Sequence, residues 1–162
     1  MPRVVLYQPQ IPPNTGNIAR TCAATASPLH LIEPLGFVID DRQLRRAGLD
    51  YWPWVDLHRH GDLEAFQRHR TCQGGRVVAL SAHAEQPYSQ FRFDPSDWLL
   101  FGRETEGLPA ELLATADARL GIPMAGGRHQ GGGVRSLNLS VAVAVVLFEA
   151  LRQLEPTAPQ SF

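Results

Sequence analysis

The chain has 162 residues, of which 44% are hydrophobic and 19% charged, and its formal net charge is −1. This composition predicts a globular protein with one sizeable core, and the near-neutral charge means that any nucleic acid must bind at a local basic patch. Lysine is absent and all 15 residues of the Lys+Arg count are arginine, which excludes a Schiff-base lysine and a Walker A nucleotide loop.

The first third of the chain alternates short apolar runs with helical segments. Residues 3–7 predict a buried, β-branched strand that ends before Pro9. Asn14 is the predicted N-cap of a helix that reaches about residue 25. A second strand is predicted over residues 29–32, followed by a short helix over residues 41–47.

The pattern is less regular in the middle of the chain. Residues 51–57 carry three aromatic side chains and are compatible with a short strand, whereas residues 87–95 are predicted to be irregular. We also predict helices over residues 62–69, 110–116 and 137–154, and strands over residues 76–80, 98–101 and 119–122.

Strands that alternate with helices predict an α/β fold with a mainly parallel sheet and helices on both faces. Because no linker or repeat interrupts the pattern, we predict one domain over residues 1–154 and a frayed tail over residues 155–162. The last helix is entirely apolar over residues 141–148. We therefore expect it to be buried all round, either within one chain or in a dimer interface.

The cysteines and the apolar segments of the sequence predict the cellular compartment of the protein. Cys22 and Cys72 belong to no CxxC motif, which favours reduced thiols. The residues after Met1 do not resemble a signal peptide, and the longest apolar run, residues 141–148, is too short to cross a bilayer. We expect a cytoplasmic protein that contacts no membrane.

Two segments match known ligand-binding patterns only in part. His58, His60, His69 and Cys72 are residue types that bind zinc, but their spacing fits no standard structural zinc motif, so we predict no metal. The glycine-rich residues 126–133 lack the G-x-G-x-x-G order of a dinucleotide site. A flexible loop that orders over a ligand is at least as good an interpretation.

Polar and glycine residues gather in loops at the predicted carboxyl ends of strands, where open α/β folds bind ligands. These residues are Asn14, Asn17 and Arg20, then residues 102–109, and then residues 122–123 with 135–140. Each also has an ordinary structural explanation. Asn14 and Ser136 are good helix caps, Gly102 suits a turn, and Arg20 could pair with a carboxylate. Periodicity alone does not decide between these interpretations.

Taken in order, these blocks resemble the SPOUT superfamily of S-adenosylmethionine-dependent RNA methyltransferases. The similarity is greatest to the small single-domain enzymes that methylate the ribose 2′-hydroxyl of the tRNA wobble nucleotide, and it extends from Val4 to about Leu154. The residues that carry it are 11–18 with Arg20, 30–34, 36–37, 44–51, 101–102, 104–105, 107–109, 122–124 and 135–140.

The resemblance implies a fold and a cofactor site. The C-terminal part of the family fold passes through a loop as a trefoil knot, and the family members work as homodimers. S-adenosylmethionine would be held in the knot by the backbone of three loops. The residues that match its binding positions are Leu80, Gly102, Ile122, Ser136 and Leu137.

The resemblance also implies in-line methyl transfer to a ribose hydroxyl, with Arg20 as the catalytic residue. Because a guanidinium is a poor base, we interpret Arg20 as orienting the 2′-oxygen and stabilising its developing charge, while an RNA phosphate takes the proton. The tRNA-binding residues would be Asn14, Arg42, Arg45, Arg46 and Arg135. A solvated helix face is the alternative explanation for the three clustered arginines.

Other functions stay open at this point. The chain could methylate a ribose at another tRNA or rRNA site, and the link over residues 125–134, usually short in this family, is stretched and glycine-rich here. From other classes, a non-catalytic RNA-binding module or a small nucleotide- or flavin-binding α/β protein are the alternatives.

Overall fold

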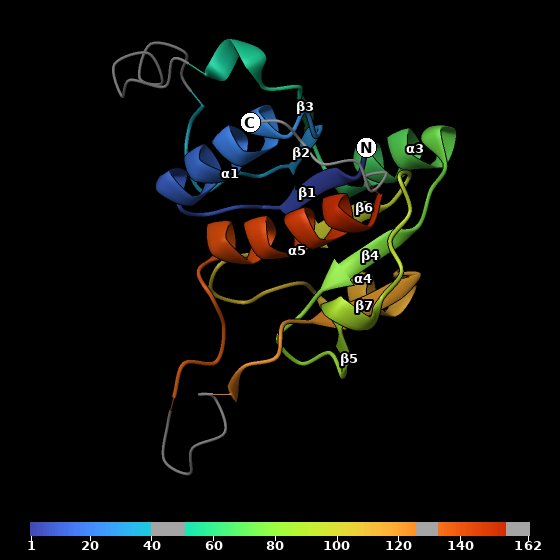
Figure 1. Ribbon diagram of the computed structural model, residues 1–162. Coiled ribbons are helices and arrows are strands. Elements are labelled where there is room, and N and C mark those ends of the chain that lie inside the picture. Colours follow the sequence, from blue (N-terminus) through green and yellow to red (C-terminus); the bar gives the residue numbers. More distant parts are fainter. Residues whose placement is uncertain (40–50, 126–132, 155–162) are drawn as a thin grey trace, which may run out of the picture.

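A parallel sheet forms the centre of the molecule in the computed structural model, which describes residues 1–39, 51–125 and 133–154 (Figure 1). Within these residues the sheet has seven strands in the order β3-β2-β1-β6-β4-β7-β5, and every pairing is parallel. The strands are β1 (Arg3–Tyr7), β2 (Leu29–Ile32), β3 (Leu57–His60), β4 (Val77–Leu80), β5 (Gln86–Pro87), β6 (Trp98–Phe101) and β7 (Ala118–Gly121).

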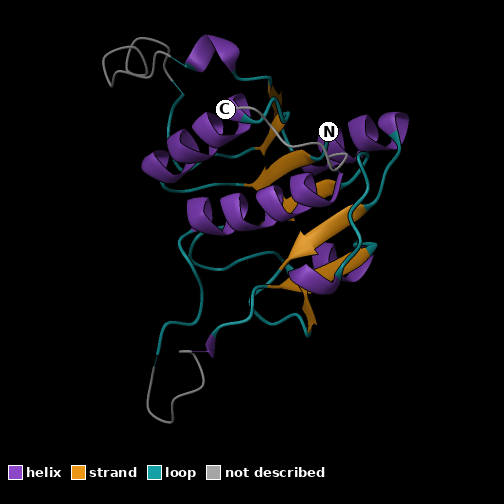
Figure 2. Ribbon diagram, viewed as in Figure 1, coloured by secondary structure: helices purple, strands orange, loops and turns teal. Residues whose placement is uncertain are grey.

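Helices cover both faces of this sheet (Figure 2). The helices α1 (Pro12–Ala24) and α5 (Leu139–Leu154) pack on one face, whereas α3 (Leu63–Gln73) and α4 (Ala110–Thr115) pack on the other. Two short 3₁₀ helices, η1 (Trp52–Trp54) and η2 (Tyr88–Gln90), lie in the connections. The arrangement confirms the predicted α/β fold class.

The central strands divide their side chains between two apolar cores. In β1, Val4 and Leu6 belong to the core under α1 and α5, whereas Val5 belongs to the core under α3 and α4. In β6, Leu99 and Phe101 face the first core, and Trp98 and Leu100 face the second. Because both faces are buried, these strands appear in the sequence as unbroken apolar runs.

The predicted N-cap at Asn14 is wrong. Helix α1 begins at Pro12, and Ile11 occupies the N-cap position without a side-chain cap. Proline lacks an N–H group and its fixed φ suits the first helical turn, so Pro12 and Pro13 leave fewer donors to satisfy. Asn14 is instead a buried residue of the first turn.

Two predictions in the middle of the chain also need correction. The aromatic residues 51–57 contribute η1, and the strand begins only at Leu57, at the end of the predicted segment. The segment predicted to be irregular, residues 87–95, contributes Pro87 to the two-residue strand β5 and also contains η2.

Helix α5 is apolar but is not buried all round within one chain. Val143, Val146 and Leu147 are fully buried, whereas Val141 and Phe148 leave 46% and 55% of their surfaces exposed. Because they are seven residues apart, Val141 and Phe148 lie on the same side of the helix. We expected α5 to be buried either within one chain or in a dimer interface. Burial within one chain accounts for only one side of the helix.

Several predictions lie wholly or partly outside the described residues. They are the helix over residues 41–47 with Arg42, Arg45 and Arg46, most of the glycine-rich segment 126–133, and the tail over residues 155–162. The trefoil knot stays a prediction as well, because part of the connection from β7 to α5 is among these residues.

Both cysteines are free, which agrees with the predicted reduced thiols. Burial raises the pKa of the Cys22 thiol to about 12, so this thiol is unreactive. Cys72 is exposed. None of the helices in the described residues has the length and apolarity needed to span a membrane.

A prediction concerns Asp97, a fully buried carboxylate directly before β6. It accepts hydrogen bonds from Nε and Nη2 of Arg76, both at 2.8 Å, and from the backbone N–H of Asp94 at 2.8 Å. We expect Asp97→Ala to lower the free energy of unfolding by about 1.5–3 kcal/mol, because the Arg76 guanidinium and the Asp94 N–H lose a buried, charged acceptor. Urea denaturation followed by circular dichroism measures the change.

The control for Asp97→Ala is Glu64→Ala, which removes an ion pair with Arg68 on the exposed side of α3. We expect this change to cost no more than about 0.5 kcal/mol, because exposed pairs are weak. If both variants lose the same free energy of unfolding, burial does not determine the strength of the Asp97 contacts.

Candidate functional site

The winding of the sheet reverses next to β1. From β1 the chain runs outward to β2 and β3, and it then crosses to β4 on the far side of β6. Strands β1 and β6 are neighbours, and the helices that follow them, α1 and α4, pack on opposite faces. The chain therefore leaves β1 and β6 toward opposite faces of the sheet, and open α/β sheets bind ligands at such a position.

The carboxylate of Glu104 joins these two loops. It accepts hydrogen bonds from the backbone N–H groups of Gln10 at 2.9 Å and Ile11 at 3.0 Å, and from Nδ2 of Asn14 at 3.3 Å. Gln10 and Ile11 directly precede α1, so the negative charge lies at the N-terminal end of this helix, where the helix dipole favours it. Glu104 thus fixes the loop after β6 against the start of α1.

Asn14 extends this connection to the start of α5. Its Oδ1 accepts a hydrogen bond from Nδ2 of Asn138 at 2.9 Å, while its own Nδ2 donates to Glu104. Oδ1 of Asn138 accepts from the backbone N–H and the hydroxyl of Ser140, at 2.9 and 2.7 Å, in the first turn of α5. A chain of side-chain hydrogen bonds therefore links three separate sequence blocks.

The loop after β6 begins with a tight turn that requires glycine. Arg103 and Gly107 exchange both backbone hydrogen bonds, at 3.1 and 3.0 Å, and Gly107 has a φ of +70°. A Cβ atom on Gly102 would lie 2.1 Å from the Gly107 carbonyl carbon, so a larger residue does not fit. The Arg103 side chain pairs with Glu106 at 2.8 Å and donates to Oε1 of Gln8.

Three of the predicted cofactor residues lie at the ends of neighbouring strands. Leu80 ends β4, while Gly102 and Ile122 directly follow β6 and β7, and β4 lies between the other two strands. Leu80 and Ile122 are half-buried and pack against the core under α1 and α5. This apolar edge fits the adenine of an adenosyl group, and Gly102 offers backbone atoms beside it, while Gly107 fills the space of its missing side chain.

The other two predicted cofactor residues, Ser136 and Leu137, lie just before α5. Ser136 is exposed and Leu137 is half-buried. Asn138, the next residue, hydrogen-bonds to Asn14, so the start of α5 is tied to the loops after β1 and β6.

The predicted catalytic residue, Arg20, lies on the exposed side of α1. Its guanidinium carbon is 5.2 Å from the centre of the Tyr51 ring, and the Tyr51 hydroxyl donates a hydrogen bond to the Gly16 carbonyl at 2.8 Å. Within the described residues, the structure does not bring Arg20 into hydrogen-bond contact with the predicted cofactor residues. Tyr51 instead provides the surface over which the guanidinium is held.

Of the five predicted RNA-binding residues, the structure describes two, Asn14 and Arg135. Arg135 is exposed before α5, and Arg42, Arg45 and Arg46 lie outside the described residues. Asn14 is buried, with both of its amide atoms already hydrogen-bonded to protein. The structure therefore gives Asn14 a role in joining loops that the sequence did not indicate.

Sequence interpretation assigned no role to Glu104, Asn138 or Tyr51, although all three lie inside the blocks that carry the family resemblance. The three Glu104 contacts span 90 to 94 positions of the chain. No local pattern reveals a contact at that separation. The only available signal was the occurrence of polar residues at the ends of several predicted strands.

Comparison with known proteins gives a consistent family assignment. The sequence profile of the SpoU rRNA Methylase family matches residues 1–148. The tRNA (cytidine(34)-2′-O)-methyltransferase of Escherichia coli (strain K12) is 47% identical over 156 residues, which cover 95% of this chain and 94% of that protein.

Two solved structures are similar in fold as well. One, described as giving structural insights into the 2-OH methylation of C/U34 on tRNA, is 52% identical with a TM-score of 0.84 and covers 95% of this chain and 96% of its own. The AdoMet-bound rRNA methyltransferase from Sinorhizobium meliloti is 31% identical with a TM-score of 0.79, and covers 96% of this chain and 57% of its own.

A second prediction tests the link made by Glu104. We expect Glu104→Ala to lower the free energy of unfolding by about 1–2 kcal/mol, because two backbone N–H groups and the Asn14 amide lose a charged acceptor. Thermal and urea denaturation measure the loss.

The matched control is Glu106→Ala, which removes another carboxylate of the same turn and leaves the contacts to Gln10 and Ile11 intact. Its exposed pair with Arg103 should contribute less than about 0.5 kcal/mol. If Glu106→Ala destabilises the protein as much as Glu104→Ala, the link between the loops is not the source of the stability.

Proposed function

The chain belongs to the SpoU rRNA Methylase family, and we propose that it is a tRNA (cytidine(34)-2′-O)-methyltransferase. It would methylate the ribose 2′-hydroxyl of nucleotide 34, whether cytidine or uridine. The observation that carries this proposal is the similarity, over nearly the full length of both chains, to the Escherichia coli enzyme of that activity. The family profile matches residues 1–148, which include each loop of the candidate site.

We propose S-adenosylmethionine as the methyl donor, supported by the family and by the AdoMet-bound relative. When bound, it supplies an electrophilic methyl group on a sulfonium centre. The apolar side chains of Leu80 and Ile122 and backbone atoms of Gly102 would hold the adenosyl part. Ser136 and Leu137 would complete the site from the start of α5.

Arg20 is the proposed catalytic residue for the RNA hydroxyl. Because a guanidinium carries N–H donors and no acceptor, Arg20 would donate hydrogen bonds to the 2′-oxygen and stabilise its developing negative charge. An RNA phosphate would take the proton. The ring of Tyr51 beside the guanidinium would limit the directions in which Arg20 can point.

The proposed tRNA contacts come from arginine side chains, with Arg135 beside the cofactor residues and Arg42, Arg45 and Arg46 on the segment after β2. Planar guanidinium groups suit bidentate contacts to phosphate. We propose that Asn14 contributes indirectly, by holding together the loops after β1 and β6 and the start of α5.

We also propose a homodimer in the cytoplasm, with residues 1–154 acting as one catalytic domain. The exposed side of α5 that carries Val141 and Phe148 is the proposed contribution of this helix to the dimer interface. Burial in a dimer would remove these apolar side chains from water.

The reaction is tested with labelled S-adenosylmethionine and total tRNA that lacks ribose methylation at nucleotide 34. We expect label in tRNA, located at the ribose of nucleotide 34 by nuclease mapping. Ribosomal RNA is the comparison substrate. Label in ribosomal RNA alone would favour the alternative methyltransferase, and absence of cofactor binding would favour a non-catalytic module.

The role of Arg20 is tested with Arg20→Ala. We expect the rate of methyl transfer to fall at least 100-fold, because the developing charge on the 2′-oxygen loses its donor. The Kd for S-adenosylmethionine, measured by calorimetry, should change less than about twofold, since Arg20 is proposed to contact RNA and not the cofactor.

The control for Arg20→Ala is Arg68→Ala, which removes an exposed arginine of α3 on the other face of the sheet. Its rate should match that of the parent protein. Loss of cofactor binding in Arg20→Ala would instead assign Arg20 a structural role.

A further inference from the structure

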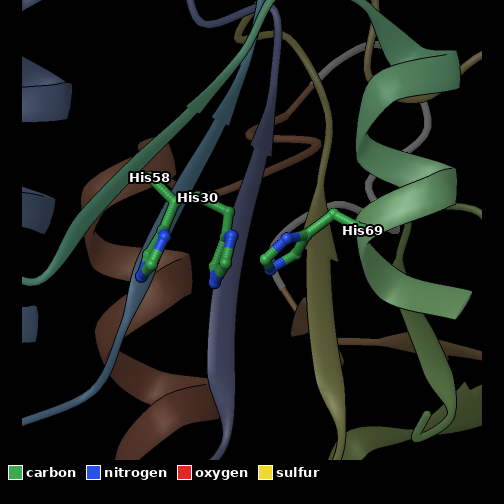
Figure 3. Close-up of side chains that lie close together, drawn as sticks. All are labelled: His30, His58 and His69. Carbon is green, nitrogen blue, oxygen red and sulfur yellow. The ribbon is translucent and has the colours of Figure 1, made fainter. Parts of the chain in front are cut away.

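Four histidines gather between the sheet and α3. The parallel pairing of β2 with β3 places His30 opposite His58, and His60 lies two residues further along β3, on the same face. His69 joins this group from α3, and Figure 3 shows its ring pointing toward those of His30 and His58. The proposed methyl transfer uses none of these side chains.

The positions of three of these rings are suited to a shared ligand. One ring nitrogen from each of His30, His58 and His69 lies within 4.8 Å of the other two. The rings of His30 and His58 are stacked with centroids 4.4 Å apart, and the His69 centroid is 5.5 Å from that of His30. A zinc ion with bonds of about 2.0–2.1 Å brings tetrahedral nitrogens to about 3.3 Å from one another.

Binding one ion requires the rings to move closer together. The nitrogens must approach one another by up to about 1.5 Å, and the His58 ring must turn out of its stacked position so that its lone pair and that of His30 converge on the ion. His58 and His69 are half-buried, whereas His30 is fully enclosed. The buried His30 therefore provides the fixed member of the set.

Two neighbouring side chains hold the rings from the outside. Nδ1 of His30 lies 3.0 Å from Nε2 of His60, and Nε2 of His58 lies 2.9 Å from Oδ1 of Asp56. Each contact leaves the second nitrogen of His30 or His58 for another ligand. Histidines that bind metals commonly use their other nitrogen in this way, especially with a carboxylate.

The cluster is also accessible from the solvent. Strand β3 is an edge strand and the His58 side chain is 40% exposed, so an ion can enter from the solvent.

We propose that His30, His58 and His69 form a binding site for one divalent transition-metal ion that prefers imidazole ligands, with Zn²⁺ as the expected ion. Three protein ligands leave a fourth position for water. The sequence predicted no metal because the spacing of His58, His60, His69 and Cys72 fits no standard structural zinc motif. The fold adds His30 from a neighbouring strand, a contribution that no local spacing shows.

The test measures ion binding without tRNA or S-adenosylmethionine, so its result is independent of the proposed enzymatic function. Untagged protein is treated with a chelator, dialysed and titrated with Zn²⁺ by calorimetry, and Co²⁺ is added separately for its absorption spectrum. We expect one ion per chain, a Tm that rises with Zn²⁺ concentration, and Co²⁺ bands typical of tetrahedral coordination.

Variants assign the site to these residues. We expect His58→Gln and His69→Gln to weaken Zn²⁺ binding at least tenfold, and Asp56→Asn to weaken it less, because Asp56 acts through His58. His83→Gln, which changes an exposed histidine outside the cluster, should bind Zn²⁺ like the parent. Circular dichroism spectra confirm that each variant is folded.

Two results would overturn the proposal. One is a parent protein that binds neither Zn²⁺ nor Co²⁺, which would leave the cluster as packed neutral imidazoles. The other is equal Zn²⁺ affinity in the parent, His58→Gln and His69→Gln proteins, which would place the ion elsewhere on the chain.

Discussion

The arrangement of the candidate site depends on the carboxylate of Glu104. The hydrogen bonds between parallel strands fix β1 and β6 against each other, but these ladders stop where the strands end. Beyond that point, a side chain must satisfy the backbone N–H groups of Gln10 and Ile11, and Glu104 does so from the other loop. Because Asn14 connects the same carboxylate to Asn138, the start of α5 is held in the same network.

The chain uses arginine in structural as well as functional positions. Arg76 makes two parallel hydrogen bonds to the buried Asp97 and a third to the Arg92 carbonyl, a set of contacts that needs a planar, forked donor. A lysine there would offer one compact charged group instead. The absence of lysine therefore does not by itself indicate phosphate binding, and it leaves the proposed RNA contacts to particular positions such as Arg20 and Arg135.

The sequence predicted the buried strands best and the polar contacts least. The bounds of β1, β2 and β6 agree with prediction because strands that are covered on both faces form short apolar runs. The strand β5 is two residues long at the edge of the sheet and includes a polar Gln86, so it has no such signal. Asn14 was mistaken for a helix cap because its partners, Glu104 and Asn138, are 90 and 124 positions away.

The histidine cluster and the proposed cofactor residues occupy different parts of the same sheet. Leu80, Gly102 and Ile122 lie at the ends of β4, β6 and β7, whereas His58 and His60 belong to β3 at the opposite edge from β5. An edge strand has one unpaired side, and β3 is held only by its backbone hydrogen bonds to β2, its packing and its side-chain contacts. An ion bound by His58 and His69 would join this strand to α3, while His30 would join it to β2. Such an ion would therefore stabilise the edge of the fold without contributing a group to the reaction.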